Sequence, residues 1–472
     1  MIATDLAFAP VAELVRLIRT RELSPVELVR TYLDRIDRWD DRLHAYVTVC
    51  REVALREAKE AEAAVMRGER LGALHGVPVA VKDQFLTKGV RTTNGMRTLA
   101  TFVPDEDATA VTRLREAGAV LLGKLNMPEG GMLGTRDWPF GQPRNPWNVE
   151  HDAGASSTGG GIAVAAALCA AALGEDTGGS IRNPASYNGV VGVRPTWGRV
   201  SRHGIMPLVW SMDTAGPMTR TVADSALVLQ VIAGHDPKDA FSAQLPVPDY
   251  AAALDGEVRG LRIGVIRELF ESTFLDRETG DAVRAAAAVF GRLGARIDEV
   301  SLPMILLGGV VFCAIADSGT ALQHRHALAT EPERFDAGPR RRMLAASLLP
   351  VALYLKVEQA RALMRDQVHA ALERFDILLC PTSPAPAARI AKAQVATWTT
   401  EDLIRFWQRG SHTSPFSLAA VPALSIPCGF SASGLPIGMQ LVGRPFGEAT
   451  ILRAAHTYEA SSDTHVKRPP LS

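Results

Sequence analysis

Two glycine-rich loops near the middle of the chain carry serine residues that could act in catalysis. The first loop spans residues 154–161 and contains Ser156, and the second spans residues 174–180 and ends at Ser180. Lys82 stands at the end of a short apolar run that is rich in β-branched residues and typical of a buried strand. Glycine loops with serines are ordinary turns when taken alone, so the combination with Lys82 is the informative feature.

The chemistry open to these residues is nucleophilic attack on a carbonyl carbon. A serine hydroxyl is a poor nucleophile unless a base takes its proton. A lysine can be that base only when it is neutral, and burial disfavours its charged form. Gly178 and Gly179 allow several N–H groups to converge on one point, and one such donor typically contributes about 10²–10³ in rate. A helix beginning near Thr158 would place its positive end beside Ser156.

The elements that would position these residues alternate between strands and helices. Ser24, Pro25 and Glu27 form a capping box with proline at the first helical position, so a helix starts there. Periodicity and composition predict further helices over 51–67, 108–117, 162–172, 281–293, 357–375 and 448–460. Short apolar runs predict strands at 76–81, 119–122, 261–266, 377–379, 424–427 and 438–442. Such alternation indicates a partly parallel sheet covered by helices.

Bulk composition excludes several functional classes. The chain has 51 Lys and Arg residues and 51 Asp and Glu residues, so its formal net charge is zero. A basic surplus marks nucleic-acid binders and proteins of anionic membranes, so neither partner is expected. The longest apolar run noted, residues 162–173, has about 12 residues, whereas a spanning helix needs about 20.

The cysteines and the N-terminus point to the cytoplasm. The five cysteines are odd in number and far apart, without a Cys-x-x-Cys pair, so neither a disulfide frame nor a zinc site is expected. Residues 1–21 lack the basic start, apolar middle and cleavage site of a signal peptide. The histidines show no metal-binding spacing.

Several separated motifs, in consistent order and spacing, resemble the amidase-signature family. The resemblance covers nearly the whole chain and is weakest between residues 300 and 375. The motifs that carry it are Val79–Asp83, Gly154–Gly161, Gly174–Arg182, Asn183–Ala185, Gly189–Thr196, Gly198–Ser201, Asp213–Met218, Leu379–Thr382, Pro422–Ser425 and Gly434–Gln440.

The resemblance implies a catalytic triad and the fold around it. Ser180 matches the family's nucleophile, Ser156 its bridging serine, and Lys82 its base. The oxyanion hole would consist of four consecutive backbone N–H groups, those of Thr177, Gly178, Gly179 and Ser180. The family uses neither a metal nor a cofactor. Its fold is α/β, with a large, mixed, mostly parallel twisted sheet and helices on both faces.

The whole chain, residues 1–472, is expected to form one domain. N-terminal helices would occupy residues 1–70. The signature core, which contains the triad, would occupy residues 71–220. A cover over the substrate site would be formed by residues 300–410.

The sequence departs from the family pattern at a few positions near the predicted site. Ala155, Thr158 and Gly160 stand where the first loop usually has Gly, Gly and Ser. Glu175 stands where Thr or Ser is more usual, and a carboxylate there could alter the hydrogen bonds near the site. Gly130 follows Glu129, at a position where the family more often has an aromatic residue.

Five further residues are candidates for supporting the site. Gly131 and Met132 belong to the segment 130–134, which is expected to form a wall of the substrate pocket. Ser157 would either bind the loop backbone near the oxyanion hole or cap the following helix. Asp176 and Arg182 flank the nucleophile, and would either contact substrate or form an ion pair that braces the loop.

The predicted activity is cleavage of an amide-like C–N bond through an acyl-enzyme on Ser180. Small amides, anilides, carbamates (urethanes) and esters all suit this mechanism. A second hypothesis is the glutaminase subunit of a tRNA-dependent amidotransferase, which shares the triad and works in a complex. A third, a non-catalytic scaffold on the same fold, is disfavoured because all three triad residues are present. Homodimers occur in the family, and nothing in the sequence indicates the seam of one.

Overall fold

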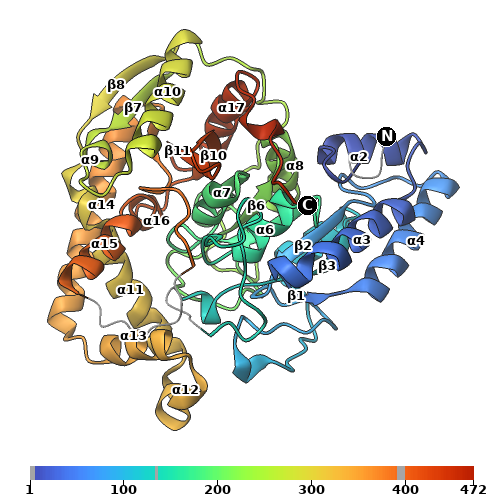
Figure 1. Ribbon diagram of the computed structural model, residues 1–472, viewed down its shortest axis with the longest axis horizontal. Helices are drawn as coiled ribbons and strands as arrows, with labels where there is room; N and C mark the ends of the chain where they lie inside the picture. The colour runs from blue at the N-terminus through green and yellow to red at the C-terminus, as the bar shows by residue number, and fades with distance from the viewer. Residues whose placement is uncertain (1–5, 133–136, 391–398, 472) are drawn as a thin grey trace.

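A single eleven-stranded sheet runs through the computed structural model, which describes residues 6–132, 137–390 and 399–471 (Figure 1). The strands lie in the order β1-β3-β2-β4-β6-β5-β10-β11-β9-β7-β8. Their bounds are β1 Tyr46–Val49, β2 Pro78–Lys82, β3 Val120–Leu125, β4 Ala171–Glu175, β5 Val191–Arg194, β6 Ala215–Thr219, β7 Arg262–Ile266, β8 Arg296–Val300, β9 Ile377–Pro381, β10 Ala423–Phe430 and β11 Pro436–Gly443.

The sheet is mixed, as predicted, but its parallel share is smaller than expected. Four of the ten pairings between neighbouring strands are parallel, those of β2 with β3 and β4 and those of β7 with β8 and β9. The other six pairings are antiparallel. The centre is antiparallel because β10 and β11 form a hairpin and because β5 and β6, which the sequence analysis did not predict, insert between the two parallel groups.

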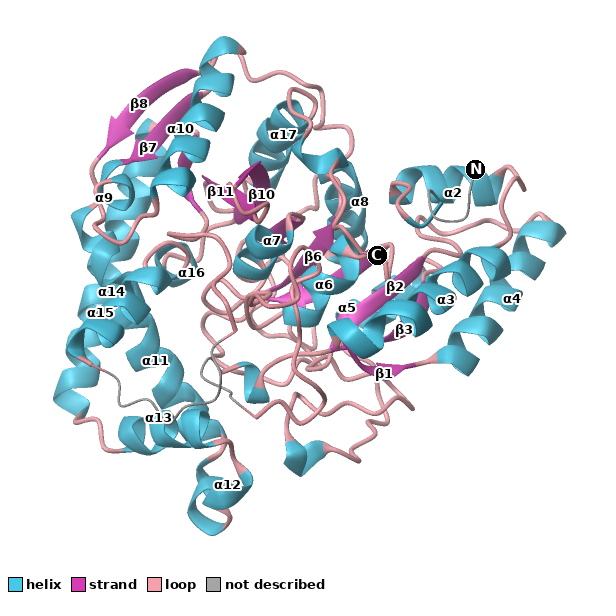
Figure 2. Cartoon of the chain, in the orientation of Figure 1, coloured by secondary structure: helices cyan, strands magenta, loops and turns pink. Residues whose placement is uncertain are grey.

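Helices cover both faces of this sheet (Figure 2). Helices α6 and α7 contact each other and the central strands, whereas α8, α10 and α17 form a second group on those strands. Helices α3 and α4 pack at the β1 end. The bounds are α2 Val11–Arg19, α3 Pro25–Leu43, α4 Arg51–Arg67, α5 Thr109–Glu116, α6 Thr158–Ala165, α7 Arg182–Asn188, α8 Val222–Ile232, α9 Arg267–Phe270, α10 Arg277–Arg292 and α17 Glu448–Glu459.

Most helices predicted from the sequence are present, with small shifts at their ends. Ser24 caps α3 as the capping box predicts, because its side chain accepts hydrogen bonds from the N–H groups of Val26 and Glu27. The helix predicted over 162–172 is wrong in extent. Helix α6 ends at Ala165, Ala167 adopts a left-handed φ of 52°, and the chain then enters β4. Periodicity cannot separate a buried helix from a buried strand in a continuous apolar run.

A further group of helices lies beside the β9–β11 part of the sheet, at lower left in Figure 1. Its members are α11 Gly308–Gln323, α12 Arg325–Thr330, α13 Ala337–Ser347, α14 Val351–Arg374, α15 Thr400–Gly410 and α16 Ser414–Leu418. These helices occupy most of residues 300–410, the segment predicted as a cover, of which residues 391–398 lie outside the described structure.

One helical segment in the described ranges, Pro303–Gln323, is long and apolar enough to cross a membrane by length and composition alone, and the bent pair α13–α14 passes the same test. The sequence analysis overlooked the apolar run at 302–316, which is longer than the run at 162–173 and ends before Asp317. Its helix α11 packs against α13, α14, α15 and α16, and core helices of globular proteins pass the same test.

Candidate active site

Lys82 is the last residue of β2, and its side chain is almost fully buried, with 1% of its surface exposed. Strand β2 is parallel to β4, with Val81 paired to Leu173. The carboxyl ends of parallel neighbours meet at the same edge of a sheet, so Lys82 lies beside Glu175, the last residue of β4.

The Lys82 amine makes three hydrogen bonds. Its Nζ lies 2.8 Å from Ser156 Oγ, 2.9 Å from Glu175 Oε2 and 3.2 Å from the Glu175 main-chain oxygen. The structure therefore joins two of the three predicted triad residues. It also adds a buried carboxylate that the sequence analysis identified only as a departure from the family pattern.

The first glycine loop brings Ser156 to Lys82. The peptide bond between Ala155 and Ser156 is cis. Helix α6 begins at Thr158, two residues after Ser156, so its N-terminal end lies beside the serine as expected. Close packing fixes this helix, because a Cβ on Gly159 would lie 2.2 Å from the main-chain oxygen of Ala45.

Asp176 organises the second glycine loop. Its Oδ1 accepts the Gly179 N–H at 2.7 Å, and its Oδ2 accepts the Ile181 N–H at 3.1 Å. These bonds span the turn that carries Ser180. The Ser157 N–H donates to the Ser180 main-chain oxygen at 2.9 Å, which ties the two loops together.

Asp176 and Arg182 form a buried ion pair, with 2.9 Å between Oδ1 and the guanidinium. Arg194 lies on the other side, 3.4 Å from the same oxygen. Burial alone would raise the pKa of Asp176, but the two guanidinium groups hold it well below its usual range. Arg182 also donates to Thr413 O, Gln440 Oε1 and Ser417 Oγ. This ion pair matches the bracing interpretation of Asp176 and Arg182.

The four N–H groups of the predicted oxyanion hole differ in their hydrogen bonding. The Gly179 N–H is already bound to Asp176. Those of Thr177, Gly178 and Ser180 make no hydrogen bond within the described ranges. Three of the four N–H groups therefore have no acceptor in the described structure, whereas the fourth is bound to Asp176.

Ser180 is half-buried, whereas Ser156 is 1% exposed. The Ser180 hydroxyl has no hydrogen-bond partner among residues 6–132, 137–390 and 399–471, and none joins it to Ser156. Ser180 is therefore partly exposed to solvent, whereas Ser156 is buried next to Lys82.

The other predicted support residues lie near this centre. The Ser157 hydroxyl donates to Glu175 O at 3.0 Å and accepts the Glu175 N–H at 3.2 Å, so it binds the loop backbone and does not cap α6. A Cβ on Gly131 would lie 3.6 Å from Ser156 Oγ, which places Gly131 beside the triad. Met132 is buried in an apolar cluster with residues of α11. The remaining predicted wall residues, 133 and 134, lie outside the described ranges.

Three residues that the sequence analysis did not single out contact the second loop. The Thr413 hydroxyl donates to Gly178 O at 2.7 Å, and the Ser414 hydroxyl reaches the same oxygen at 3.2 Å. A Cβ on Gly178 would lie 2.3 Å from Cε2 of Phe312 on α11. No local motif marks these residues, because only the fold brings them to the loop.

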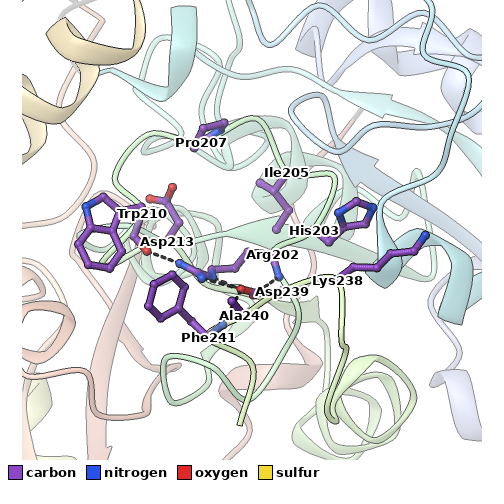
Figure 3. A pocket seen from close by; sticks show the side chains of 10 residues that line it. All are labelled: Arg202, His203, Ile205, Pro207, Trp210, Asp213, Lys238, Asp239, Ala240 and Phe241. Carbon is purple, nitrogen blue, oxygen red and sulfur yellow. Dashed lines mark hydrogen bonds and ion pairs between the residues drawn. The ribbon is translucent and has the colours of Figure 1, made fainter.

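A chain of hydrogen bonds leads from Lys82 to a surface pocket. Thr177 Oγ1 lies 2.7 Å from Glu175 Oε1 and 2.8 Å from Asp213 Oδ1. Burial, and secondly the charge of Glu175, raises the pKa of Asp213 to about 7. Asp213 also lines the pocket of about 300 Å³ shown in Figure 3, where the Arg202 guanidinium pairs with Asp239.

Comparison with known proteins shows the family of this chain. Residues 27–452 match the Amidase family. The chain belongs to the amidase family. Among curated amidase relatives, a glutamyl-tRNA(Gln) amidotransferase subunit of Moorella thermoacetica is 44% identical over 99% of both chains.

Solved structures agree with this placement. A chain from a vestigial protein complex, which reveals the evolutionary origins of an s-triazine catabolic enzyme, superimposes with a TM-score of 0.90 and 33% identity, covering 98% of this chain and 100% of that one. A bacterial aryl acylamidase of the amidase-signature family gives a TM-score of 0.88 at 28% identity, covering 98% and 99%. This amidase is thus an enzyme that acts on carbon–nitrogen amide bonds.

Proposed function

We propose that this amidase hydrolyses a small-molecule amide through an acyl-enzyme on Ser180. The Ser180 hydroxyl attacks the substrate carbonyl carbon and passes its proton through Ser156 to Lys82. The C–N bond then breaks, and the departing amine takes that proton back by the same route. Water, deprotonated by the Ser156–Lys82 pair, attacks the acyl carbon and releases the acid with regeneration of Ser180.

The observation that carries this proposal is the buried hydrogen bond between Lys82 Nζ and Ser156 Oγ, 2.8 Å long. Burial away from water favours a neutral amine over an ammonium ion. The Ser156–Ser180 hydrogen bond, absent within the described ranges, would form when substrate orders the Ser180 hydroxyl. Catalytic hydrogen bonds are often long or unmade before substrate binds.

The available N–H groups of Thr177, Gly178 and Ser180 would stabilise the negative oxygen of the tetrahedral intermediate. Removal of one such donor typically costs about 10²–10³ in rate, so this loop would contribute a large part of the acceleration. In this proposal the Gly179 N–H supports the hole through Asp176 instead of binding the oxygen itself.

The proposed substrate is a small cytoplasmic amide, anilide, carbamate or ester. Helix α11 would limit its size, because Phe312 packs on the oxyanion loop and Met132 joins residues of α11 in one apolar cluster. Residues 300–410 would in this way act as the cover of the site, within a single domain.

Release of amine or ammonia from a panel of amides, anilides, carbamates and esters tests this function, with Ser180→Ala measured in parallel. We expect activity on one class and a loss of about 10³-fold or more in the variant. Activity that survives Ser180→Ala would overturn the assignment of the nucleophile.

A second candidate function is the glutaminase component of a tRNA-dependent amidotransferase. It is supported by the 44% identity to the glutamyl-tRNA(Gln) amidotransferase subunit of Moorella thermoacetica over 99% of both chains. The altered first loop and the sequence of the 130–134 segment disfavour it, since both depart from the pattern that the sequence analysis associates with the family. Expression beside the partner subunits of a related amidotransferase distinguishes the two functions. A stable complex with glutamine-dependent activity would favour the second, and hydrolysis of small amides by the isolated chain would favour the first.

A further inference from the structure

Glu175 is the one acidic side chain in direct contact with Lys82 in the described structure, and the proposed mechanism leaves it unused. Both side chains are 1% exposed, and their charged atoms lie 2.9 Å apart. Burying an ion pair costs free energy that its mutual attraction often fails to recover, so a purely stabilising role is a weak explanation.

The hydrogen bonds between Lys82 and Glu175 can orient the lone pair of the amine. A neutral lysine amine has two N–H donors and one lone pair. Glu175 offers two acceptors, its main-chain oxygen at 3.2 Å and its Oε2 at 2.9 Å, and Ser156 Oγ is the third neighbour at 2.8 Å. When both N–H groups donate to Glu175, the lone pair is left facing the Ser156 hydroxyl. That is the orientation in which Lys82 can take a proton from Ser156.

Thr177 links Glu175 to a second buried carboxyl, that of Asp213. A hydroxyl carries one proton, so Thr177 can donate to only one of its two carboxyl neighbours, Glu175 Oε1 and Asp213 Oδ1. The other contact is a hydrogen bond only when that carboxyl is protonated and donates to Thr177. Asp213 also accepts the N–H groups of Leu208 and Val209, whereas Glu175 is the carboxyl of the described structure that faces the Lys82 amine.

The remaining charged groups around this cluster are paired elsewhere. Asp176, next to Glu175 on the chain, is bound to Arg182 and Arg194. Asp83, the residue after β2, and Lys124 on β3 face each other at 4.0 Å. Glu175 is therefore the residue whose charge acts directly on Lys82.

We infer that Glu175 is a positioning residue for Lys82, which aims the lone pair of the amine at Ser156 and sets the pH range in which the amine can act as base. The inference rests on the proposed function of Lys82. It predicts separate effects for the charge and for the hydrogen-bonding capacity of this side chain.

Three substitutions separate these effects. Glu175→Gln keeps an acceptor oxygen and removes the charge, so the ammonium loses a stabilising neighbour. The acid limb of the kcat/KM profile should then move to lower pH by about one unit or more, with the plateau nearly retained. Glu175→Met removes the acceptor as well, and the plateau should fall about 10-fold to 100-fold. Glu175→Thr introduces a residue type usual at this position in the family, and should show the same acid-limb shift even if the glutamine variant folds poorly.

The test is the pH profile of kcat/KM for hydrolysis of the best substrate on the panel, with thermal unfolding recorded for each variant. Glu459→Gln is the matched control, because Glu459 is also a buried carboxyl but lies on α17 and binds the Val222 N–H. Its activity profile should superimpose on that of the wild type. Superimposed acid limbs for wild type and for the glutamine and threonine variants would overturn the inference.

Failure of the proposed function gives a different result. In that case the wild type is inactive on the panel, or its activity survives Ser180→Ala. If activity depends on Ser180 but the pH profiles of the Glu175 variants are unshifted, only the role of Glu175 is refuted.

Discussion

Replacement of Asp176 by asparagine tests whether the second glycine loop is held in place by buried charge. The carboxylate accepts hydrogen bonds from the N–H groups of Gly179 and Ile181 and pairs with Arg182. Asparagine has a single acceptor oxygen, and its NH₂ group would face one of these donors. The variant therefore loses an ion pair and at least one loop hydrogen bond, while the volume of the side chain is almost unchanged.

The expected loss follows from the burial of Arg182, which has no exposed surface. Removing one partner of a buried ion pair typically costs about 3–5 kcal/mol, because the other charge stays buried. An unfolding entropy of about 2.1 cal/mol/K per residue gives about 1 kcal/mol/K for the 472 residues. The melting temperature should thus fall by about 3–5 °C. We expect kcat to fall about 10-fold to 100-fold, because the oxyanion loop loses its fixed geometry.

Thermal unfolding and steady-state kinetics measured on the same samples check both figures. Asp281→Asn is a suitable control, since the side chain of Asp281 is 62% exposed and its ion pairs should contribute less than about 1 kcal/mol. An Asp176→Asn variant with an unchanged melting temperature and a raised KM would refute the bracing role. That result would make Asp176 a substrate contact instead.

Other predictions concern the base, the oxyanion loop and pH. Lys82→Met should lower kcat by about 10²–10⁴ in steady-state assays, and a loss below tenfold would exclude Lys82 as the base. Gly178→Ala should lower kcat because the new Cβ would lie 2.3 Å from Phe312 Cε2, and Phe312→Ala in the same chain should restore part of it; additive losses would contradict this clash. Burial raises the pKa of Glu459 from its ordinary value of 4.5 to about 8, so folding favours its protonated form. The free energy of unfolding should therefore decline between pH 4.5 and 8, and Glu459→Gln should flatten that decline in denaturant titrations; an equally steep decline in the variant would argue against it.

The local parts of the fold could be predicted because neighbouring residues determine them. The predicted helix over 51–67 coincides with α4, and Lys82 does end a buried strand. Strands β5 and β6 escaped prediction because glycine interrupts the short sequence VGVR, and glycine and proline, which are depleted in strands, both occur in AGPMT. They form strands because they pair with each other and with β10 and β4.

The contact between Lys82 and Glu175 shows where the sequence alone is insufficient. The unusual type of Glu175 could be noticed in the sequence, but 93 positions separate it from Lys82 along the chain. Their contact depends on β4 lying next to β2, with β3 on the other side, and on the register that pairs Val81 with Leu173. A sequence motif records which residues are present, whereas the strand order decides which of them touch.

The same reasoning explains why Asp176 is a charged residue in a buried loop. The turn that carries Ser180 leaves the N–H groups of Gly179 and Ile181 pointing into the protein, where water cannot satisfy them. A carboxylate can accept both bonds on its two oxygens, and Arg182 and Arg194 compensate its charge. An apolar residue in place of each charged group could be neutral for stability, since buried ion pairs rarely add much. It would, however, leave the two N–H groups without acceptors and release the turn. The buried charges therefore serve the geometry of the loop more than the stability of the fold.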